Sequence, residues 1–409
     1  MMKKIVAPLS IIDAKISLPT SKSISNRLLI IQALCAEPFQ INNLSLAADT
    51  VRLKHLIDHP LSIQDCGEGG TTFRFLLALR AVQNLNLELS GAPRMLERPI
   101  GPLVQALNSL GAEIRFTGKE GYPPVQILQG LRKGGNVSIP GNISSQFLSA
   151  LMLIGPYLEG GLVLVPQQHL VSQPYLEMTI NLMRYFGVRV EEKDGTYMVA
   201  EGNYSEKDIT VAPDWSSASY WFGIAACLPG SRITLKNLAL DQFQGDAILM
   251  KWMKDFGVKA SVVGDDIQLF SEEIIVNNDL HFDCSGNPDL AQTLAVVAAI
   301  KGVTLKLTGL STLRIKETDR IDALQIELLK SGVEVIVDGD SMIVQGRVLP
   351  EKVSASVFKT YNDHRMAMSL AILSCSGGTV SLDETDIVRK SYPDFFKDLI
   401  TAGFQMEGL

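Results

Sequence analysis

Basic side chains gather near the starts of several apolar segments of this chain, although its formal net charge is −7. They are Lys22, Arg27, Arg98, Lys316, Arg320, Arg365 and Lys390, and two acidic residues, Asp289 and Glu317, stand among them. Lys and Arg bind phosphate and carboxylate groups directly. Because the chain as a whole is acidic, a general nucleic-acid surface is disfavoured. The local positive charge instead indicates small substrates that carry several negative charges.

Residues 18–31 combine these features most densely. Lys22 and Arg27 are interleaved with Ser21 and Ser23, directly before an apolar run. Ser or Thr ahead of an apolar segment is typical of a helix N-cap. The first N–H groups of such a helix lack internal partners, and the helix dipole makes that end positive. This segment therefore predicts a binding site for an anion, most naturally a phosphate.

Asp289 differs from the other residues at helix starts because it adds negative charge. Directly after Pro288, it would on its own be an ordinary helix cap. In a site lined by cations, a general base or an acceptor for a substrate hydroxyl is the better interpretation. The spacing of Lys316 and Arg320 predicts that both lie on one helix face, with Glu317 beside them.

A small or capping residue followed by an apolar helix recurs along the chain at a nearly constant spacing. The anchors are Ser23, Thr71, Ser144, Ser216, Asp289 and Asp363, which are 48, 73, 72, 73 and 74 residues apart. Glycines that end a helix before an alternating strand occur at Gly111, Gly187, Gly257, Gly332 and Gly403, which are 76, 70, 75 and 71 residues apart. Two independent markers with one period indicate about six copies of an α/β unit, the first of them short.

Each copy contains one helix that is apolar nearly all round and one that is amphipathic. An all-apolar helix is buried, whereas an amphipathic helix faces water. The predicted fold class is therefore α/β: two domains of three repeated units each, with buried parallel helices surrounded by sheets. Pro19 and Pro213 mark the expected crossings between a discontinuous domain, residues 1–19 and 213–409, and a second domain, residues 20–212.

Composition and motifs narrow the class further. The chain is 46% hydrophobic and 20% charged, as globular proteins are. Its five scattered cysteines form no C-x-x-C pair, which argues against a disulfide framework or a zinc site and favours a reducing cytosol. We expect no signal peptide, because Asp13 and Lys15 interrupt the apolar stretch near the N-terminus, and the apolar runs such as Leu294–Ile300 are far shorter than a membrane span. Nucleotide-loop and metal-ligand motifs are also missing, so we expect no metal and no cofactor.

Five motifs in the chain resemble those of the EPSP synthase family, the 3-phosphoshikimate 1-carboxyvinyltransferases. They are Ser21-Lys-Ser-x-Ser-Asn-Arg27, Gly91-x-Pro-Arg-Met-x-Glu-Arg-Pro-Ile100, Ser144-Ser-Gln-Phe147, Lys316-Glu-Thr-Asp-Arg320 and Asn362-Asp-His-Arg-Met366. The resemblance extends from Lys22 to Pro393. It implies an inside-out fold of two domains with three repeats each, in agreement with the period above. It also implies an active site in the interdomain cleft.

The resemblance further implies an activity and its residues. The enolpyruvyl group of phosphoenolpyruvate would pass to the 5-hydroxyl of shikimate 3-phosphate, through a tetrahedral intermediate and with release of phosphate. Implied contacts to shikimate 3-phosphate are Lys22, Ser23, Arg27, Ser144, Ser145, Gln146, Ser172, Asp289 and Lys316. Implied contacts to phosphoenolpyruvate are Lys22, Gly70, Arg98, Gln146, Arg320, Arg365 and Lys390. Asp289 would take the hydroxyl proton, and Glu317 with Lys22 would handle the proton at the methylene carbon.

On this resemblance the partners are the two small-molecule substrates, with no nucleic acid and no membrane, and we expect a cytoplasmic monomer. The chain departs from the family pattern in residues 45–66, which are shortened, with Ala48-Asp49 where two Asp are frequent, and at three single positions. Glu68 stands where Asn is usual, Phe75 where Pro is usual, and Thr312 where Asn is common. Gly70 leaves room for the inhibitor glyphosate.

Three other classes share parts of this pattern. A sister enolpyruvyl transferase acting on a UDP-sugar would carry a reactive loop cysteine and an early Lys-Asn pair, but Lys22 is followed by Ser23. An RNA 3′-phosphate cyclase would need a catalytic histidine motif, which the five histidines do not form. A non-catalytic binder of phosphorylated metabolites would have no use for the carboxylates of Asp289 and Glu317.

Overall fold

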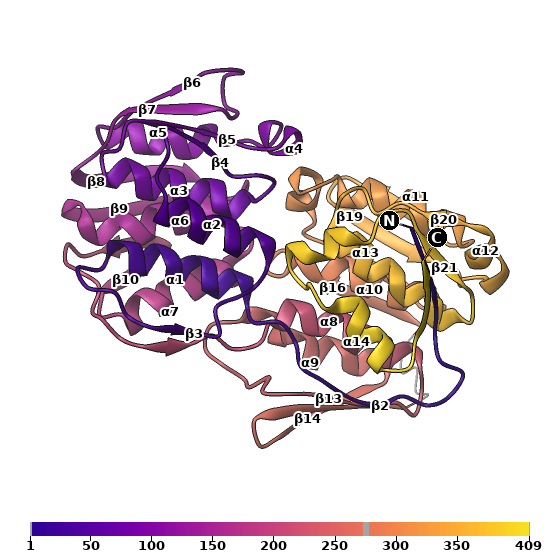
Figure 1. Cartoon of the computed structure of the whole chain (residues 1–409). Helices are drawn as coiled ribbons and strands as arrows, with labels where there is room; N and C mark the ends of the chain where they lie inside the picture. The colour runs from indigo at the N-terminus through magenta and orange to yellow at the C-terminus, as the bar shows by residue number, and fades with distance from the viewer. Residues whose placement is uncertain (1, 273–277, 409) are drawn as a thin grey trace. The chain divides into compact units, whose positions relative to one another are not determined.

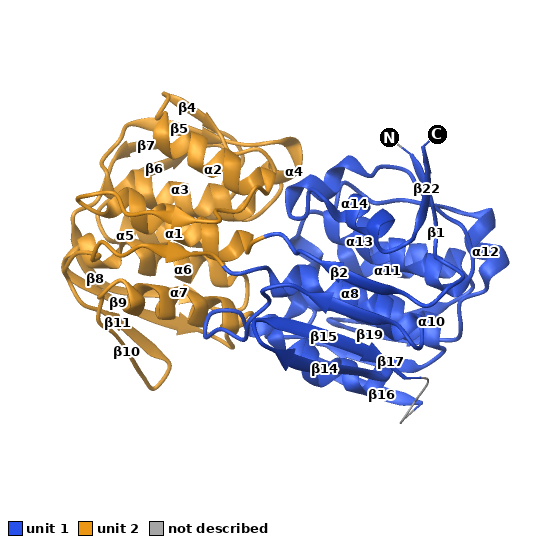
Figure 2. Ribbon diagram, turned by 60° about the horizontal axis from the view of Figure 1, so that its bottom comes forward, with its two compact units in different colours: residues 1–19, 212–409 blue, residues 20–211 orange. Residues whose placement is uncertain are grey.

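The computed structural model describes residues 2–272 and 278–408. The chain divides into two compact units (Figure 2). Unit 1 comprises Met1–Pro19 and Ala212–Leu409, and unit 2 is Thr20–Val211. No helix in the two described ranges is long and apolar enough to cross a membrane.

One sheet topology recurs through both units. In each four-stranded sheet two parallel strands lie side by side, and one of them pairs with an antiparallel hairpin or its equivalent. Among the described residues these sheets are β4-β5-β7-β6 and β10-β11-β9-β8 in unit 2, and β14-β15-β13-β2, β16-β17-β19-β18 and β20-β21-β1-β22 in unit 1. In the last of them the N-terminal strand β1 replaces one hairpin strand and lies between β21 and the C-terminal β22. A two-stranded parallel sheet pairs β3 of the short first repeat with β12 at the exit from unit 2.

Unit 2 contains the elements from α1 to β12. The helices are α1 (Lys22–Leu34), α2 (Ala48–Asp58), α3 (Gly70–Val82), α4 (Pro93–Leu96), α5 (Gly101–Ser109), α6 (Ser145–Ile154) and α7 (Gln173–Tyr185). The strands are β3 (Ile41–Asn42), β4 (Ile63–Asp65), β5 (Leu87–Ser90), β6 (Glu113–Phe116), β7 (Val125–Gln129), β8 (Lys133–Pro140), β9 (Glu159–Gln167), β10 (Val190–Lys193), β11 (Thr196–Val199) and, at the exit, β12 (Ile209–Thr210). The hairpin β10–β11 thus closes the third repeat before the chain leaves the unit.

Unit 1 repeats the same plan. Its α-helices are α8 (Trp215–Cys227), α9 (Leu249–Trp252), α10 (Ala291–Lys301), α11 (Arg320–Lys330), α12 (Pro350–Ala355), α13 (His364–Ala371) and α14 (Phe395–Thr401). Its strands are β1 (Lys3–Val6), β2 (Asp13–Ile16), β13 (Arg232–Leu235), β14 (Val258–Val263), β15 (Asp266–Ser271), β16 (Asp279–Asp283), β17 (Thr304–Thr308), β18 (Glu334–Asp338), β19 (Ser341–Gln345), β20 (Val357–Phe358), β21 (Val380–Leu382) and β22 (Gln405–Gly408).

The predicted burial of the apolar helices is confirmed. Helix α8 is buried along its whole length, and in α10 every residue but Lys301 is buried. Figure 1 shows the corresponding helices α1, α3 and α6 stacked in the interior of unit 2. The outer helices α5, α7 and α11 instead alternate buried and exposed residues, as amphipathic helices do. The α/β fold class predicted from the sequence is therefore correct.

The repeat period predicted from the sequence also appears as contacts between residues at equivalent positions of the central helices. In unit 1 the Thr293 hydroxyl lies 3.2 Å from that of Ser219 and 3.4 Å from that of Ser369. The three residues come from α8, α10 and α13, and they are 74 and 76 positions apart. The five glycines predicted to end helices all have left-handed φ, between 85° and 104°: Gly111, Gly187, Gly257, Gly332 and Gly403.

One predicted helix start is wrong. Helix α11 begins at Arg320, and Lys316 precedes it in extended backbone, so the two do not share a helix face. The reason is a cap: the Asp319 side chain accepts hydrogen bonds from the N–H groups of Ile321 and Asp322, which starts the helix there.

Gly223 offers a test of how closely the central helices of unit 1 pack. A Cβ atom at this position of α8 would lie 2.9 Å from Ile372, 3.0 Å from Thr293 and 3.2 Å from Val297. Gly223→Val should therefore lower the free energy of unfolding by about 1–3 kcal/mol through overpacking. Urea denaturation followed by tryptophan fluorescence measures this, because Trp215 and Trp221 lie in the same helix.

Gly202→Val is the matched control, since nothing lies within 4 Å of the corresponding Cβ position. Its unfolding free energy should stay within about 0.5 kcal/mol of the parent. Equal urea midpoints for Gly223→Val and the parent protein would contradict the close packing of α8.

Candidate active site

The Asp289 carboxylate of unit 1 is surrounded by three cations. It lies in the 3-10 turn η4 (Pro288–Leu290), directly before α10. Its Oδ1 lies 2.8 Å from Arg320 Nη1 and 3.3 Å from Lys316 Nζ, and its Oδ2 lies 3.1 Å from Arg365 Nη2. The carboxylate does not cap α10. The plain helix-cap interpretation of Asp289 is thus ruled out by its contacts.

Arg320 is the centre of this network. Its side chain is only 1% exposed, and beside Asp289 it donates to two further carboxylates. Nε and Nη2 lie 2.7 and 3.2 Å from the two oxygens of Asp363, and Nη2 also lies 3.0 Å from Glu317 Oε2. Burial would lower the pKa of the Arg320 guanidinium, but the three carboxylates outweigh burial and raise that pKa.

Lys390 completes the group from another part of unit 1. It lies at the end of the 3-10 turn η7 (Asp386–Lys390), is buried, and its Nζ is 3.3 Å from Glu317 Oε1. We call the whole set the unit 1 cluster: the carboxylates Asp289, Glu317 and Asp363 with the cations Lys316, Arg320, Arg365 and Lys390. Four cations face three carboxylates, so the cluster carries a formal surplus of one positive charge.

The charge state of Asp289 is determined by this arrangement. Burial by itself would raise the pKa of the carboxyl group, but Arg365, Lys316 and Arg320 outweigh burial and hold that pKa well below its usual range. Asp289 is therefore ionised at neutral pH.

In unit 2 two guanidinium groups meet at the N-terminus of α3. A Cβ atom on Gly70 would lie 2.7 Å from Arg74 Nη1 and 2.8 Å from both Arg98 Nη atoms. Only glycine lets the two side chains come this close to the helix end, whose N–H groups and dipole favour an anion. We call this set the unit 2 arginine pair: Arg74 and Arg98 at Gly70.

Arg74 is a residue that the sequence interpretation missed. It is 2% exposed, its Nη1 donates to Gln146 Oε1 at 2.6 Å, and its guanidinium lies 5.0 Å from the centre of the Phe147 ring. It thereby joins Gly70, at the start of α3, to Gln146, at the start of α6. The signal was its position one turn after two glycines at a helix start.

Arg27 is a structural hub as well as a predicted substrate contact. It is 3% exposed and donates to Ser23 O at 2.8 Å, Thr179 Oγ1 at 2.7 Å and Tyr175 O at 2.9 Å. Burial lowers the pKa of its guanidinium to about 10, which leaves the group charged at neutral pH. These bonds hold α1 against α7.

The other predicted residues of unit 2 lie at helix starts. Lys22 is the first residue of α1, and its Nζ lies 3.1 Å from Asp49 Oδ2. Ser144 caps α6 by accepting from the Gln146 N–H at 3.3 Å, and Ser145 is the first residue of that helix. Ser172 precedes α7 in left-handed backbone, with φ of 54°.

Two of the departures from the family pattern lie against these residues. The Phe75 ring centre is 5.4 Å from the Arg27 guanidinium. The Glu68 carbonyl oxygen accepts from Arg98 Nη1 at 3.4 Å. The third, Thr312, is 5% exposed, and its hydroxyl has no hydrogen-bond partner within the described part of the chain.

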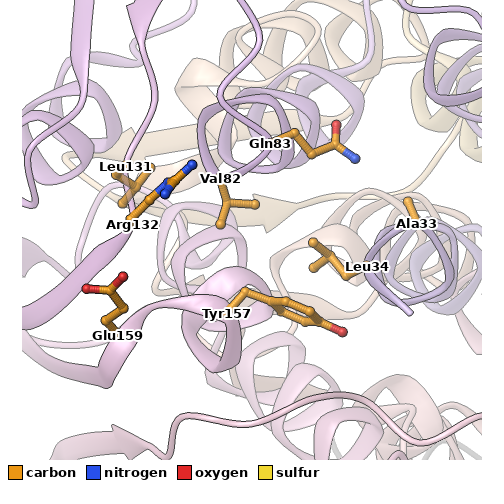
Figure 3. Close-up of a pocket in the computed structure, with 8 residues that line it drawn as sticks. All are labelled: Ala33, Leu34, Val82, Gln83, Leu131, Arg132, Tyr157 and Glu159. Carbon is orange, nitrogen blue, oxygen red and sulfur yellow. The ribbon is translucent and has the colours of Figure 1, made fainter. Parts of the chain in front are cut away.

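A hollow of about 410 Å³ in unit 2 lies away from these residues (Figure 3). Its lining includes Leu34 and Val82, the last residues of α1 and α3, so it faces the opposite helix ends from Lys22 and Gly70. In unit 2, Lys22, Arg74 and Arg98 thus lie near the N-terminal ends of α1 and α3, where the helix dipole adds to their charge.

Comparison with known proteins shows the family of the chain. The sequence model described as EPSP synthase (3-phosphoshikimate 1-carboxyvinyltransferase) matches residues 51–399. A 3-phosphoshikimate 1-carboxyvinyltransferase of Bacteroides fragilis (strain YCH46) is 39% identical over 404 residues, which cover 98% of each chain. One of Escherichia coli O127:H6 is 34% identical over 421 residues, which cover 96% of this chain and 97% of that protein.

Solved structures share the fold. An EPSP synthase of Acinetobacter baumannii matches with a TM-score of 0.80 at 22% identity, over 100% of both chains. The enolpyruvyl transferase NikO of Streptomyces tendae matches with a TM-score of 0.76 at 15% identity, over 99% of this chain and 98% of that one. With sequence relatives that span nearly its whole length and a family model that matches most of it, the chain belongs to the EPSP synthase family.

Proposed function

We propose that the unit 1 cluster and the predicted site residues of unit 2 carry out the family's reaction in this chain. In that reaction the enolpyruvyl group of phosphoenolpyruvate is transferred to the 5-hydroxyl of shikimate 3-phosphate, and phosphate is released. The observation that carries the proposal is a pair of carboxylates held by one shared cation. Asp289 and Glu317 both contact Arg320, and their other cationic partners differ. Such a pair can supply an acid and a base to one substrate complex.

The addition step needs one proton removed and one delivered. Asp289 accepts the proton of the 5-hydroxyl, whose oxygen then bonds to C2 of phosphoenolpyruvate. Glu317 in its protonated form, with Lys22, delivers a proton to the methylene carbon, which becomes a methyl group. C2 is then tetrahedral and carries the methyl, carboxylate, phosphate and shikimate-ether groups.

The elimination step removes the proton that the addition step placed on the methyl carbon. Glu317 takes a proton back from the methyl group, the carbon–carbon double bond re-forms, and the C2–O bond to phosphate breaks. The leaving phosphate takes the electron pair of that bond and the proton that Asp289 accepted from the hydroxyl, so Asp289 and Glu317 both return to their starting states. Fixed positive charge around the leaving group lowers the barrier. In our assignment Arg98, Arg320, Arg365 and Lys390 supply that charge from the positions they take in the substrate complex, and Lys22, Gly70 and Gln146 complete the phosphoenolpyruvate contacts.

Charge balance gives the cations a second role. In the protein alone Asp289 is held by three cations, which makes it a weak base. Anionic substrates that draw Arg320 and Arg365 toward themselves weaken this hold, so the pKa of Asp289 rises when the substrates bind. We therefore propose that the base is activated only in the complex, which keeps proton transfer coupled to substrate binding.

Shikimate 3-phosphate is assigned to the remaining polar side chains. Ser23, Arg27, Ser144, Ser145, Gln146 and Ser172 in unit 2 contact it in this proposal, together with Lys22, and Asp289 and Lys316 in unit 1 complete the set. Helix starts at α1, α6 and α7 supply N–H donors for its anionic groups. We also propose that the protein is cytoplasmic and monomeric. Size-exclusion chromatography with light scattering measures the mass in solution and tests the monomeric state.

The activity itself is the first test. Purified protein given shikimate 3-phosphate and phosphoenolpyruvate should release phosphate, and neither substrate alone should support release. The same assay with a UDP-sugar acceptor in place of shikimate 3-phosphate should be silent. Folded protein that binds both substrates but releases no phosphate would make the chain a binder of phosphorylated metabolites and refute the proposal.

Asp289→Ala separates catalysis from binding. Loss of the base should lower kcat by roughly 10²–10⁴-fold. Because Arg320, Lys316 and Arg365 lose a competing carboxylate, calorimetry should find shikimate 3-phosphate binding weakened far less than kcat. The control is Glu272→Ala, which removes an exposed ion pair to Lys259 and should leave both quantities unchanged. A variant that mainly loses binding would make Asp289 a positioning residue instead.

Lys22→Met tests the assigned role in proton transfer. The side chain keeps its length but loses its charge, so turnover should fall to background while the circular dichroism spectrum and Tm stay close to those of the parent. Lys54→Met is the matched control, because Lys54 forms an exposed pair with Asp58 in the same unit. Near-normal turnover of Lys22→Met would remove Lys22 from the mechanism.

A further inference from the structure

The turn before α13 has an unusual backbone. The Asp363 N–H donates to the Thr360 carbonyl oxygen at 2.9 Å, which closes a four-residue turn. Both central residues are left-handed, Tyr361 with φ of 55° and Asn362 with φ of 52°. Two positive φ values are the pattern of a type I′ turn, which strongly favours Asn, Asp and Gly. Asn362 suits this turn, whereas an aromatic residue at the first central position is strained and needs support from its surroundings.

That support comes from a buried carboxylate on α11. Glu327 is 0% exposed, and its Oε1 accepts from the Tyr361 hydroxyl at 2.7 Å. Its Oε2 accepts from the Lys359 N–H at 3.0 Å and from Lys330 Nζ at 2.6 Å. Burial and the Glu327 charge both raise the pKa of the Tyr361 hydroxyl, so it remains a proton donor at neutral pH.

The turn is held from its other side by the residue after β21. Asp383 Oδ1 accepts from the Thr360 N–H at 2.9 Å and from the Thr360 hydroxyl at 3.0 Å. Two carboxylates from separate elements therefore fix residues 359–361. The position of the residue on the C-terminal side, Asp363, follows from this fixed turn, because its N–H closes the turn on the Thr360 carbonyl.

Asp363 follows the central residues of the turn, and it contacts both arginines of the unit 1 cluster, Arg320 through its guanidinium and Arg365 through its backbone N–H. Its carboxylate receives Nε and Nη2 of Arg320 at 2.7 and 3.2 Å. It also accepts from the Arg365 N–H at 2.8 Å, as the cap of α13. A shift of the turn moves this carboxylate, and with it Arg320 and the helix end that carries Arg365.

We propose that Tyr361 and Glu327 are positioning residues for the reaction: their hydrogen bond holds the left-handed turn that aligns Arg320 and Arg365 for phosphoenolpyruvate. This inference rests on the proposed function for the identity of the substrate. The contacts that connect the two residues to the unit 1 cluster run through the turn and Asp363. When the turn relaxes, only the fraction of molecules that retains the aligned form binds the anion, and the apparent affinity falls by that fraction.

Tyr361→Phe removes only the hydroxyl. The loss of one hydrogen bond to a charged acceptor should raise KM for phosphoenolpyruvate about tenfold, with KM for shikimate 3-phosphate nearly unchanged. Glu327→Gln, which removes the charge, should act in the same direction. The control is Tyr185→Phe, whose hydroxyl donates to the Asp208 carbonyl oxygen in unit 2, and its kinetic constants should equal those of the parent.

A second pair of variants tests backbone strain. Tyr361→Ala and Tyr361→Gly both remove the side chain, but only glycine adopts positive φ freely. Tyr361→Gly should therefore have the lower KM for phosphoenolpyruvate of the two. Equal KM values for phosphoenolpyruvate in these two variants would overturn the proposal. An unchanged KM in Tyr361→Phe would overturn it as well, including when the Tm of that variant is lower than that of the parent.

Hydrogen exchange on the protein without substrates gives a readout that does not depend on activity. Peptides that cover residues 359–366 should exchange faster in Tyr361→Phe than in the parent, and Tyr361→Gly should exchange more slowly than Tyr361→Ala. If the parent protein releases no phosphate, the proposed function fails while this comparison still reports on the turn. Unchanged exchange in Tyr361→Phe would refute the positioning role itself.

Discussion

The structure of unit 1 depends on one buried guanidinium that three carboxylates share. Arg320 is almost completely removed from solvent, and an unpaired charge in that position would be very costly. Asp289, Glu317 and Asp363 compensate this charge. Because all three carboxylates accept hydrogen bonds from the same guanidinium, their positions relative to one another are also fixed. Lys316, Arg365 and Lys390 then offset the remaining negative charge and leave the formal surplus of one positive charge. The two carboxylates suited to proton transfer are thus held by the same group.

The repeated architecture explains how so many charged groups come together. Each repeat supplies a central helix, and in unit 1 the starts of α10 and α13 carry Asp289 and Asp363, which both contact Arg320. Parallel helices present unpaired N–H groups and positive dipole ends on one side, which favours anions there without further cations. In unit 2 the same arrangement brings Gly70, Arg74 and Gln146 together. The hollow at the opposite helix ends is lined by one basic and one acidic residue, whose charges offset each other.

Asp289 illustrates how far chemical reasoning from residue types extends. A carboxylate among cations was predicted to be a base, and its three cationic neighbours are consistent with that role. The same neighbours lower its basicity in the protein alone, and no sequence pattern could have indicated this, because it depends on distances between residues that are 27 to 76 positions apart. Binding of anionic substrates reconciles the two observations in the mechanism we propose.

The sequence by itself determined the repeat period, the buried helices, the helix-ending glycines and the family, because burial and chain reversal leave regular marks in local composition. Only the tertiary structure decided which charges meet. Arg74 was overlooked, the helix through Lys316 and Arg320 was wrongly predicted, and the Glu327–Tyr361 bond was invisible. Ion pairs and hydrogen bonds join positions that are distant in sequence, and their energies depend on separation and burial in space. Periodicity along the chain contains neither quantity.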